Sequence, residues 1–399
     1  MRRPRSGAAP GGRGARRLVL LTITASAVIA SACGAELSSG SVVSSEPVAA
    51  ASATAVSFAP QPHVMLSVVL VTEDWMPFSH TDGWAAMVEV RESAALRFYE
   101  AAIWEETASV HLYAFTNEFD PYFALMEQPS DAEAIAYREQ HAISVHNGMP
   151  EEESSGARSA FLRGVFEDFA SILVKRHPEA EHHLMYSGHG GPTGDLFAQQ
   201  LQRDDAAAFL STWTRLLDRP LGVIDMGGPC NKGSYEDLAN FCRYTRYYVG
   251  SDRANGGYEL DDWTFEKHRE TEAPIQYHRI LAGNASLEDA LVERVDLSRT
   301  RYEYARNNQT ENRWEQSSYL YSCDGFKDFS SAFEAYIAET VFPAPATYDL
   351  KRLMVEQKVP PNLLELFDDI FVHSVDNRDF FEWRAVANGL ITPVTRLRH

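Results

Sequence analysis

Short apolar runs alternate with longer amphipathic segments through the middle of the chain. Apolar runs of strand length occupy residues 64–72, 110–116, 183–187, 221–226 and 247–251. Apolar residues at helical spacing occupy residues 85–105, 157–176, 204–217 and 235–243. Strands that alternate with helices in this way are typical of a mostly parallel sheet flanked by helices on both faces. The pattern therefore predicts an α/β fold.

The pattern changes near residue 271, beyond which strand signals fade. Helical spacing there marks residues 287–297, 329–342 and 362–372. We expect residues 63–270 to form the α/β core and residues 271–399 to form a mainly helical C-terminal region packed on it. Residues 117–155 are acidic and show no regular pattern, so we expect them to form a long loop outside the strands and helices of this core.

The N-terminus has the pattern of an export signal. Six arginines precede an apolar run at residues 18–32, which ends in Ala-Ser-Ala before Cys33. This run is shorter than the roughly 20 residues of a membrane-spanning helix, so it predicts a signal peptide over residues 1–32. Small residues before Cys33 favour lipid attachment to that cysteine, with simple secretion as the alternative. Residues 33–62, rich in Ser, Ala and Val, then form the lipid anchor and a flexible linker. The expected location is extracytoplasmic, at the cell envelope.

The charge balance narrows the range of partners. Removing residues 1–32 takes away six arginines and no acidic residue, which leaves 30 basic and 56 acidic side chains and a net charge near −26. A chain this acidic repels nucleic acid and anionic lipid. We therefore expect no nucleic-acid partner, and membrane contact through the lipid anchor only.

Three cysteines remain after Cys33, so at least one has no partner within the chain. A bridge from Cys230 to Cys242 would have to span the helix predicted between them, and disulfides need Cα atoms within about 7 Å. Pairing of Cys242 with Cys323 is easier and would leave Cys230 as a free thiol, although pairing of Cys230 with either one stays an alternative.

Two predicted strands end in residues that suit acyl-transfer chemistry. His189, within Gly188-His189-Gly190-Gly191, follows the strand at residues 183–187, and Cys230 follows the strand at residues 221–226. Ligands collect at the carboxyl ends of parallel strands. A thiolate is a nucleophile, and an imidazole beside it activates the thiol or protonates the leaving amine. Backbone N–H groups of Gly190 and Cys230 would stabilise the oxyanion.

Other kinds of site fit these residues less well. His182 and His183 point to opposite faces of a strand, so at most one could join His189 in a metal set, and no obvious Cys or carboxylate completes a zinc set. We expect no metal site. The glycine-rich loop lacks the Lys-Ser/Thr of a phosphate-binding loop. Ser187 lies outside any Gly-x-Ser-x-Gly elbow, which argues against a serine hydrolase.

Four segments occur in the order found in one known peptidase family. They are residues 184–191, which run into His-Gly-Gly; residues 222–236, with Asp225, Cys230 and Glu236; residues 247–258, with Ser251-Asp252 and Gly256-Gly257-Tyr258; and residues 313–321, with Gln316-Ser317-Ser318. With these segments the chain resembles the clostripain family of caspase-like cysteine peptidases.

The resemblance implies a caspase-hemoglobinase-like fold and a clostripain-like cysteine endopeptidase that cleaves peptides after Arg or Lys. His189 would be the general acid/base and Cys230 the nucleophile. Asp225 and Asp252 would form the acidic substrate-binding pocket, because a buried carboxylate favours a guanidinium partner. The resemblance implies no cofactor and leaves a calcium requirement open.

The chain departs from the family just before Cys230. The family has one residue between its Asp and Cys, whereas four residues, including Pro229, separate Asp225 from Cys230 here. Proline removes an N–H and restricts the residue before it, so the loop cannot copy the usual turn. Either the longer loop restores the site, or the chain is a catalytically inactive caspase-fold lipoprotein that binds a peptide or protein partner.

Overall fold

The computed structural model describes residues 61–71, 96–114, 142–151, 154–227, 229–252, 277, 285–307, 317–339, 347–376 and 391–393. The predicted signal peptide, Cys33, the linker up to residue 60 and the motif at residues 256–258 lie outside these ranges and stay predictions. No helix within the described ranges combines the length and apolar character needed to cross a membrane.

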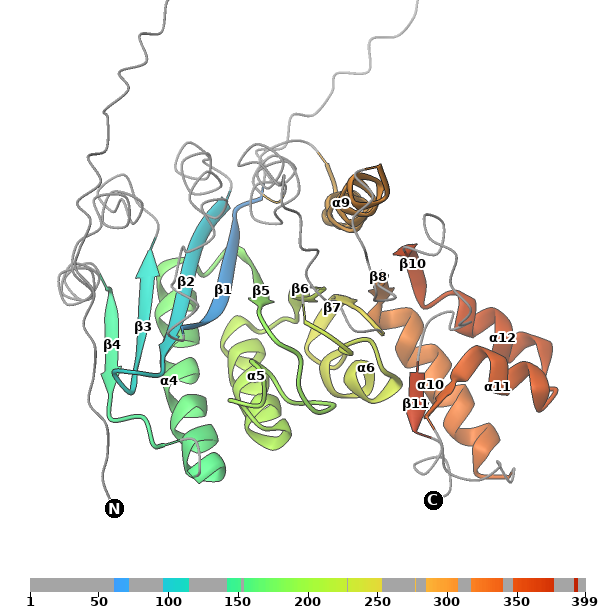
Figure 1. Ribbon diagram of the computed structural model, residues 1–399, viewed down its shortest axis with the longest axis horizontal. Coiled ribbons are helices and arrows are strands. Elements are labelled where there is room, and N and C mark those ends of the chain that lie inside the picture. Colours follow the sequence, from blue (N-terminus) through green and yellow to red (C-terminus); the bar gives the residue numbers. More distant parts are fainter. Residues whose placement is uncertain are drawn as a thin grey trace, which may run out of the picture. The chain divides into compact units, whose positions relative to one another are not determined.

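A mostly parallel sheet organises the described residues (Figure 1). Its nine described strands, in sheet order, are β10 (Phe371–Asp376), β8 (Ser317–Ser322), β7 (Thr245–Gly250), β6 (Leu221–Met226), β5 (Glu181–Ser187), β1 (His63–Val71), β2 (Leu96–Trp104), β3 (Ser109–Ala114) and β4 (Ser144–Asn147). The five central strands, from β7 to β2, are parallel to one another. The outer strands pair antiparallel. The predicted α/β fold with a mostly parallel sheet is confirmed.

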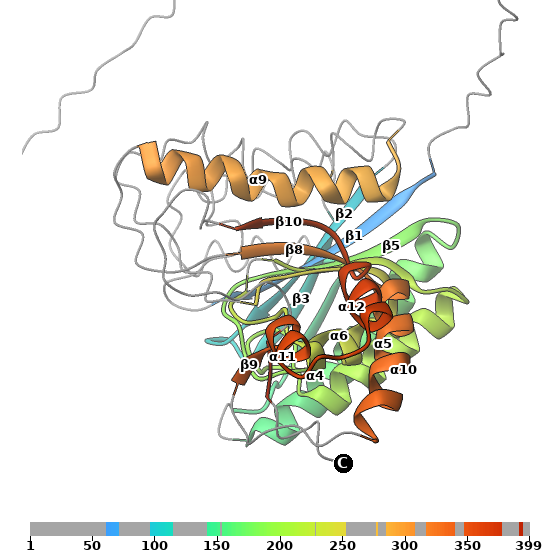
Figure 2. The ribbon, with the colours of Figure 1, turned by 90° about the vertical axis from the view of Figure 1, so that its right-hand side faces the viewer.

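Helices cover both faces of this sheet. The described helices are α4 (Ser155–Arg176), α5 (Arg203–Leu217), α6 (Tyr235–Phe241), α9 (Leu287–Asn307), α10 (Cys323–Ile337), α11 (Leu350–Glu356) and α12 (Pro361–Asp368). One core joins α4, α5, α6 and α10 to α12 with Val64, Leu66 and Val68 of β1. The other joins α9 with Met65 of β1 (Figure 2). Alternate residues of β1 thus enter different cores, as strand geometry requires.

The segment at residues 96–104 corrects one prediction. The spacing of apolar residues predicts a helix over residues 85–105, but β2 occupies Leu96–Trp104, while residues 85–95 lie outside the described ranges. Eight of the nine residues of β2 are buried, so both of its faces are covered and no alternation of polar residues reveals a strand. Ala101 and Ala102 add a local preference for helix that sheet pairing overrides.

The C-terminal region contains strands as well as helices. The expected helices are present as α9, α10 and α12, although α12 ends at Asp368 and β10 begins at Phe371. β8 and β10 extend the main sheet beyond β7, and β9 (Thr347–Asp349) pairs with β11 (Ile391–Pro393). Residues 271–399 therefore build part of the sheet, which the fading strand signals did not predict.

A disulfide joins two helices of the larger core. Cys242, the C-cap residue of α6, is bonded to Cys323 at the start of α10, with their Cα atoms 4.8 Å apart. Cys230 is a free thiol in the described part of the chain. The pairing that the sequence analysis favoured is confirmed.

Candidate functional site

The loops that follow β5 and β6 meet at the carboxyl edge of the sheet. The two strands are parallel neighbours, with Leu184 opposite Ile224. Parallel neighbours end at the same edge, so the loop carrying His189 and the loop carrying Cys230 both leave the sheet there. Two residues 41 positions apart in sequence are thereby brought into one site.

Gly190 lies in direct backbone contact with Cys230. A Cβ atom added to Gly190 would overlap the carbonyl oxygen of Cys230 and would lie 3.0 Å from its backbone nitrogen. Real Cβ atoms essentially never approach other atoms so closely, so only glycine fits at position 190. The backbone of Cys230 therefore lies against the loop of His189, although four residues separate Cys230 from Asp225 in the sequence.

A pocket of about 390 Å³ opens between these loops. Its described lining consists of His189, Gly190, Gly191, Pro192, Gln199, Cys230 and Asn231. The imidazole of His189 is exposed, while Cys230 is half-buried. An exposed histidine and a free thiol thus line one pocket.

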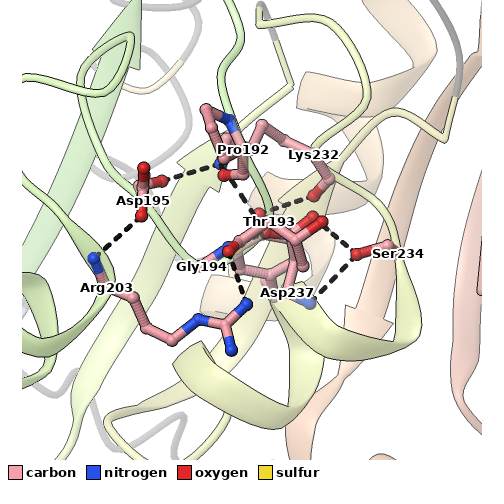
Figure 3. A network of polar contacts seen from close by, with 9 residues as sticks. Pro192, Thr193, Gly194, Asp195, Arg203, Lys232, Ser234 and Asp237 are labelled. Carbon is pink, nitrogen blue, oxygen red and sulfur yellow. Dashed lines mark hydrogen bonds and ion pairs between the residues drawn. The ribbon is translucent and has the colours of Figure 1, made fainter. Parts of the chain in front are cut away.

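A buried lysine holds the two loops together. Nζ of Lys232, two residues after Cys230, donates hydrogen bonds to the carbonyl oxygens of Pro192 and Asp195, each at 2.7 Å. Its ion-pair partner is Asp237, whose Oδ1 lies 3.6 Å away. Figure 3 shows residues of the two loops gathered in this network. We call it the Lys232 clamp, which comprises Lys232, Ser234, Asp237, Arg203 and residues 192–195.

The other members of the Lys232 clamp fix residues 192–195 from two helices. Asp237 in α6 accepts hydrogen bonds from the Gly194 backbone N–H, at 2.8 Å, and from the Ser234 hydroxyl, at 2.8 Å. At the start of α5, the Arg203 backbone N–H donates to Asp195 and its guanidinium donates to the Thr193 carbonyl, each at 2.8 Å. The backbone just after His189 is thus tied to both α5 and α6.

Burial makes the Lys232 clamp energetically demanding. The side chains of Lys232 and Asp237 are 1% and 0% exposed. Burial lowers the pKa of Lys232, and the carboxylates of Asp237 and Asp195 act in the opposite direction. Burial also raises the pKa of Asp195. Removing one partner of such a pair leaves a buried charge uncompensated. We therefore expect the position of the two loops to depend on Lys232 and Asp237 being present together.

A left-handed turn presents Gln199 to the pocket. Phe197, Ala198 and Gln199 have φ values of 56°, 54° and 71°, a conformation that costs about 1–2 kcal/mol for each residue other than glycine. Paired hydrogen bonds between Leu196 and Leu201 close the turn. Phe197 is fully buried against Phe166, with ring centroids 4.9 Å apart. The core thus holds the backbone in a strained form beside the pocket.

Asp225 lies at the end of β6, with its carboxylate directed to α9. Its Oδ2 accepts hydrogen bonds from the Arg294 guanidinium at 3.0 Å and from the Tyr277 hydroxyl at 2.9 Å. Its Oδ1 accepts from the Gly227 N–H at 2.9 Å. The side chain is 1% exposed and is not among the residues that line the pocket. Its role in substrate binding stays a prediction, and a basic substrate would have to share this carboxylate with Arg294.

Asp252 lies just beyond the carboxyl end of β7, the strand next to β6. The side chain is 4% exposed, and its Oδ1 accepts a hydrogen bond from the Ser317 hydroxyl at 2.6 Å. It does not line the described pocket. The strand order places Asp252 at the same edge of the sheet as Cys230, and its predicted role in substrate binding stays a prediction.

Comparisons with known proteins were made against families, sequences and structures. No protein-family model and no curated protein sequence matches the chain. This chain is similar to solved structures of C11 cysteine proteases. An inactive C11 zymogen from Parabacteroides distasonis matches with 12% identity and a TM-score of 0.47, over 79% of this chain and 84% of its own. The secreted Bacteroides thetaiotaomicron protease iotapain has 9% identity and a TM-score of 0.49, over 79% and 87%.

A third match is a secreted C11 cysteine protease from Bacteroides thetaiotaomicron in complex with an irreversible peptide inhibitor. It shows 11% identity and a TM-score of 0.48, over 79% of this chain and 85% of its own.

His189 and Cys230, the two residues predicted from the sequence as the catalytic pair, line one pocket, but the residues that fix their loops were not predicted. Lys232 lies in a polar loop and has no periodic pattern that signals burial. Ser234 and Asp237 have the spacing of a helix cap, so the predicted start of this helix at residue 235, which the structure confirms for α6, could have drawn attention to both residues. No local signal predicts the left-handed turn, because none of Phe197, Ala198 and Gln199 is a residue that favours it.

Proposed function

We propose that this chain is an exported, clostripain-type cysteine endopeptidase with His189 and Cys230 as its catalytic pair. One observation carries the proposal: these two residues line one pocket, where the Gly190 backbone packs on that of Cys230 at the ends of two parallel strands. The resemblance of residues 184–191 and 222–236 to the clostripain family agrees with it.

The chemistry follows from the two side chains. His189 takes the thiol proton, and the Cys230 thiolate attacks the carbonyl carbon of the scissile peptide bond. The tetrahedral oxyanion accepts hydrogen bonds from the backbone N–H groups of Gly190 and Cys230. His189 then gives its proton to the leaving amine, which breaks the C–N bond and leaves a thioester. Water hydrolyses the thioester and restores the free thiol.

A preference for Arg or Lys before the scissile bond is part of the proposal. The net charge near −26 of the exported chain attracts basic peptides. Asp252, at the same edge of the sheet, is the carboxylate that we assign to the specificity pocket. Asp225 is the weaker choice, because Arg294 already pairs with its carboxylate.

A second function rests on the four residues, including Pro229, that separate Asp225 from Cys230. If this longer loop holds the thiol out of line with His189, the pocket binds a peptide without cleaving it. The chain would then be a catalytically inactive, peptide-binding lipoprotein. Thiol reactivity distinguishes the two functions.

The test is labelling of the purified mature protein with an Arg-containing peptide electrophile directed at cysteine. We expect one label at Cys230 in the wild type, and none in Cys230→Ala. His189→Ala should slow labelling by about 100-fold or more, because proton transfer by a positioned side chain contributes about that much. A peptide with Glu in place of Arg is the matched control.

Two results would overturn the proposal that the chain is a peptidase. A folded wild type that binds the peptide reversibly but does not react would indicate the inactive binding protein. Labelling that is equally fast in His189→Ala would show a reactive thiol without a catalytic partner. Circular dichroism of each variant establishes that the fold is retained.

A further inference from the structure

Three metal-ligating side chains converge at the amino edge of the sheet, opposite the edge that holds Cys230. His63 opens β1, Glu181 opens β5, and His183 lies two residues further along β5. His63 is paired with Glu181 in the register of these parallel strands. Nδ1 of His63 lies 3.0 Å from Nε2 of His183 and 3.7 Å from Oε2 of Glu181.

We propose that His63, Glu181 and His183 bind a divalent transition-metal ion, with zinc as the best match. One ligand atom from each residue can be chosen so that all lie within 4.8 Å of one another. Tetrahedral zinc, with bonds of about 2.0–2.2 Å, needs ligand atoms roughly 3.4 Å apart. The two distances at His63 lie on either side of this value. Two imidazoles and one carboxylate form a known zinc set that leaves a fourth position for water.

Burial prepares the two imidazoles for a metal. His183 is fully buried, and His63 is 8% exposed. Burial, with a smaller contribution from the Arg246 charge, lowers the pKa of His63 to about 4. Burial also lowers the pKa of His183. Neutral imidazole is the form that ligates a metal, so burial of the two rings acts in the same direction as the short distance between their nitrogen atoms.

Neighbouring residues orient the ligands. Arg246 donates a hydrogen bond to Oε1 of Glu181 and leaves Oε2 turned toward His63. Hydrogen bonding of this kind commonly fixes ligating carboxylates. The Arg246 charge opposes a cation here as it opposes protonation of His63, but its pairing with Glu181 and the 46% exposure of its side chain reduce this repulsion. Gly222 leaves the space for the His183 ring, because a Cβ atom there would overlap Cε1 of that ring.

The His183 ring is not fixed by any other bond. Its Nδ1 is buried and has no hydrogen-bond partner among the described residues. The ring of His182, the residue before it in β5, lies on the opposite face of the sheet. There it forms hydrogen bonds with the His177 carbonyl and the indole N–H of Trp213. The predicted opposite orientation of His182 and His183 is confirmed. The partners that complete the set, His63 and Glu181, are ones that the sequence analysis did not identify.

The site joins β1 to β5, the strand that leads into the loop of His189. A bound ion would therefore act as a structural cross-link in the sheet, distant from the pocket. An ion that binds the folded chain but not the unfolded chain raises the free energy of unfolding. The increase is proportional to the logarithm of the ratio of metal concentration to Kd. This inference is independent of the proposed peptidase activity.

The test measures zinc binding to the mature protein after removal of metal by a chelator. We expect one zinc per chain by mass spectrometry of the metal content, and a higher unfolding temperature with zinc than without it. His63→Gln and Glu181→Gln should each weaken zinc affinity by about ten-fold or more and abolish the temperature shift. The control variant is His146→Gln, which removes a partly exposed histidine elsewhere and should bind zinc like the wild type.

Several outcomes would overturn the proposal. Zinc binding that is absent, or equal in wild type, His63→Gln and Glu181→Gln, would show a hydrogen-bonded polar cluster with at most adventitious surface binding. If Glu181→Gln does not fold, His63→Gln decides the question, because His63 lies at the first position of β1. Labelling of Cys230 is measured in parallel, so a failure of the peptidase proposal is recognised separately.

Discussion

The two edges of the central sheet hold their reactive groups in different ways. At the carboxyl edge, His189 and Cys230 lie in loops, and buried side chains of the Lys232 clamp fix those loops. At the amino edge, His63, Glu181 and His183 lie inside regular strands, and the register of β1 with β5 sets their spacing. The carboxyl edge therefore depends on a few side-chain contacts, whereas backbone hydrogen bonds hold the amino edge in place.

This difference leads to opposite expectations for substitutions. A single change in the Lys232 clamp should disturb both the stability and the chemistry of the pocket, because the clamp is buried and joins two loops. A change of one ligand at the amino edge should remove metal binding and leave the sheet intact. The following predictions test this contrast, beginning with the largest expected effect.

Lys232→Met should have the largest effect. It removes two hydrogen bonds to the carbonyl oxygens of Pro192 and Asp195 and leaves Asp237 buried without its cation. Loss of one partner of a buried ion pair lowers the free energy of unfolding by about 3–5 kcal/mol. Chemical denaturation measures this loss, and labelling of Cys230 in the remaining folded protein should also fall.

Two further variants make the Lys232 prediction specific. Lys175→Met, on an exposed part of α4, should change the free energy of unfolding by less than about 0.5 kcal/mol. Adding Asp237→Asn to Lys232→Met removes the uncompensated charge but keeps an oxygen to accept from Gly194, so part of the stability should return. A double variant as unstable as Lys232→Met would contradict the electrostatic explanation.

The two edges also differ in how far the sequence predicted them. Residues that follow adjacent parallel strands must meet, so the strand pattern sufficed to bring His189 and Cys230 together. The partners at the amino edge are far apart in sequence, because β1 pairs with β5 and 120 residues separate His63 from His183. Local patterns carry no information on such pairing.

The missed strands have a similar cause. β2 is buried along nearly its whole length, and its alanines favour a helix locally. β8 does not alternate between buried and exposed residues, since five of its six residues are buried. Only tertiary pairing distinguishes such segments from helix or loop, whereas long amphipathic helices such as α4 and α5 are identified by their own periodicity.

Asp225→Asn should give the next largest effect. The Arg294 side chain is 12% exposed and pairs with Asp225, so an amide at position 225 would remove this largely buried ion pair. We expect the free energy of unfolding to fall by about 3 kcal/mol. Asp368→Asn, which breaks an exposed pair with Lys351, should cost less than about 1 kcal/mol. A loss of the preference for Arg-containing peptides with unchanged stability would instead show that Asp225 binds substrate.

Gly190→Ala should affect chemistry more than stability. The new methyl group would overlap the Cys230 carbonyl and push the two loops apart. Overpacking of this kind costs about 1–3 kcal/mol. A displaced thiol should react about 100-fold more slowly, the penalty typical of a misplacement of 1 Å. Gly164→Ala in α4, where a Cβ atom meets nothing within 4 Å, is the control and should leave labelling unchanged.

Gln199→Ala should give the smallest effect on stability. Its side chain is exposed at the pocket, and alanine bears the same cost of a left-handed φ as glutamine. The free energy of unfolding should therefore change by less than about 0.5 kcal/mol. If the strained turn exists to present this side chain, KM for a peptide substrate should rise about three- to ten-fold with kcat unchanged. This result is expected when a contact made equally with the substrate and the transition state is lost.

Gln199→Gly separates the strain of the turn from the role of the side chain. Glycine adopts a positive φ without steric cost, so this variant should be at least as stable as Gln199→Ala despite the greater flexibility of its unfolded chain. Both variants should show the same increase in KM, because both remove the amide group. An increase in Gln199→Gly alone would mean that the strained backbone, and not the Gln199 side chain, shapes the peptide-binding wall of the pocket.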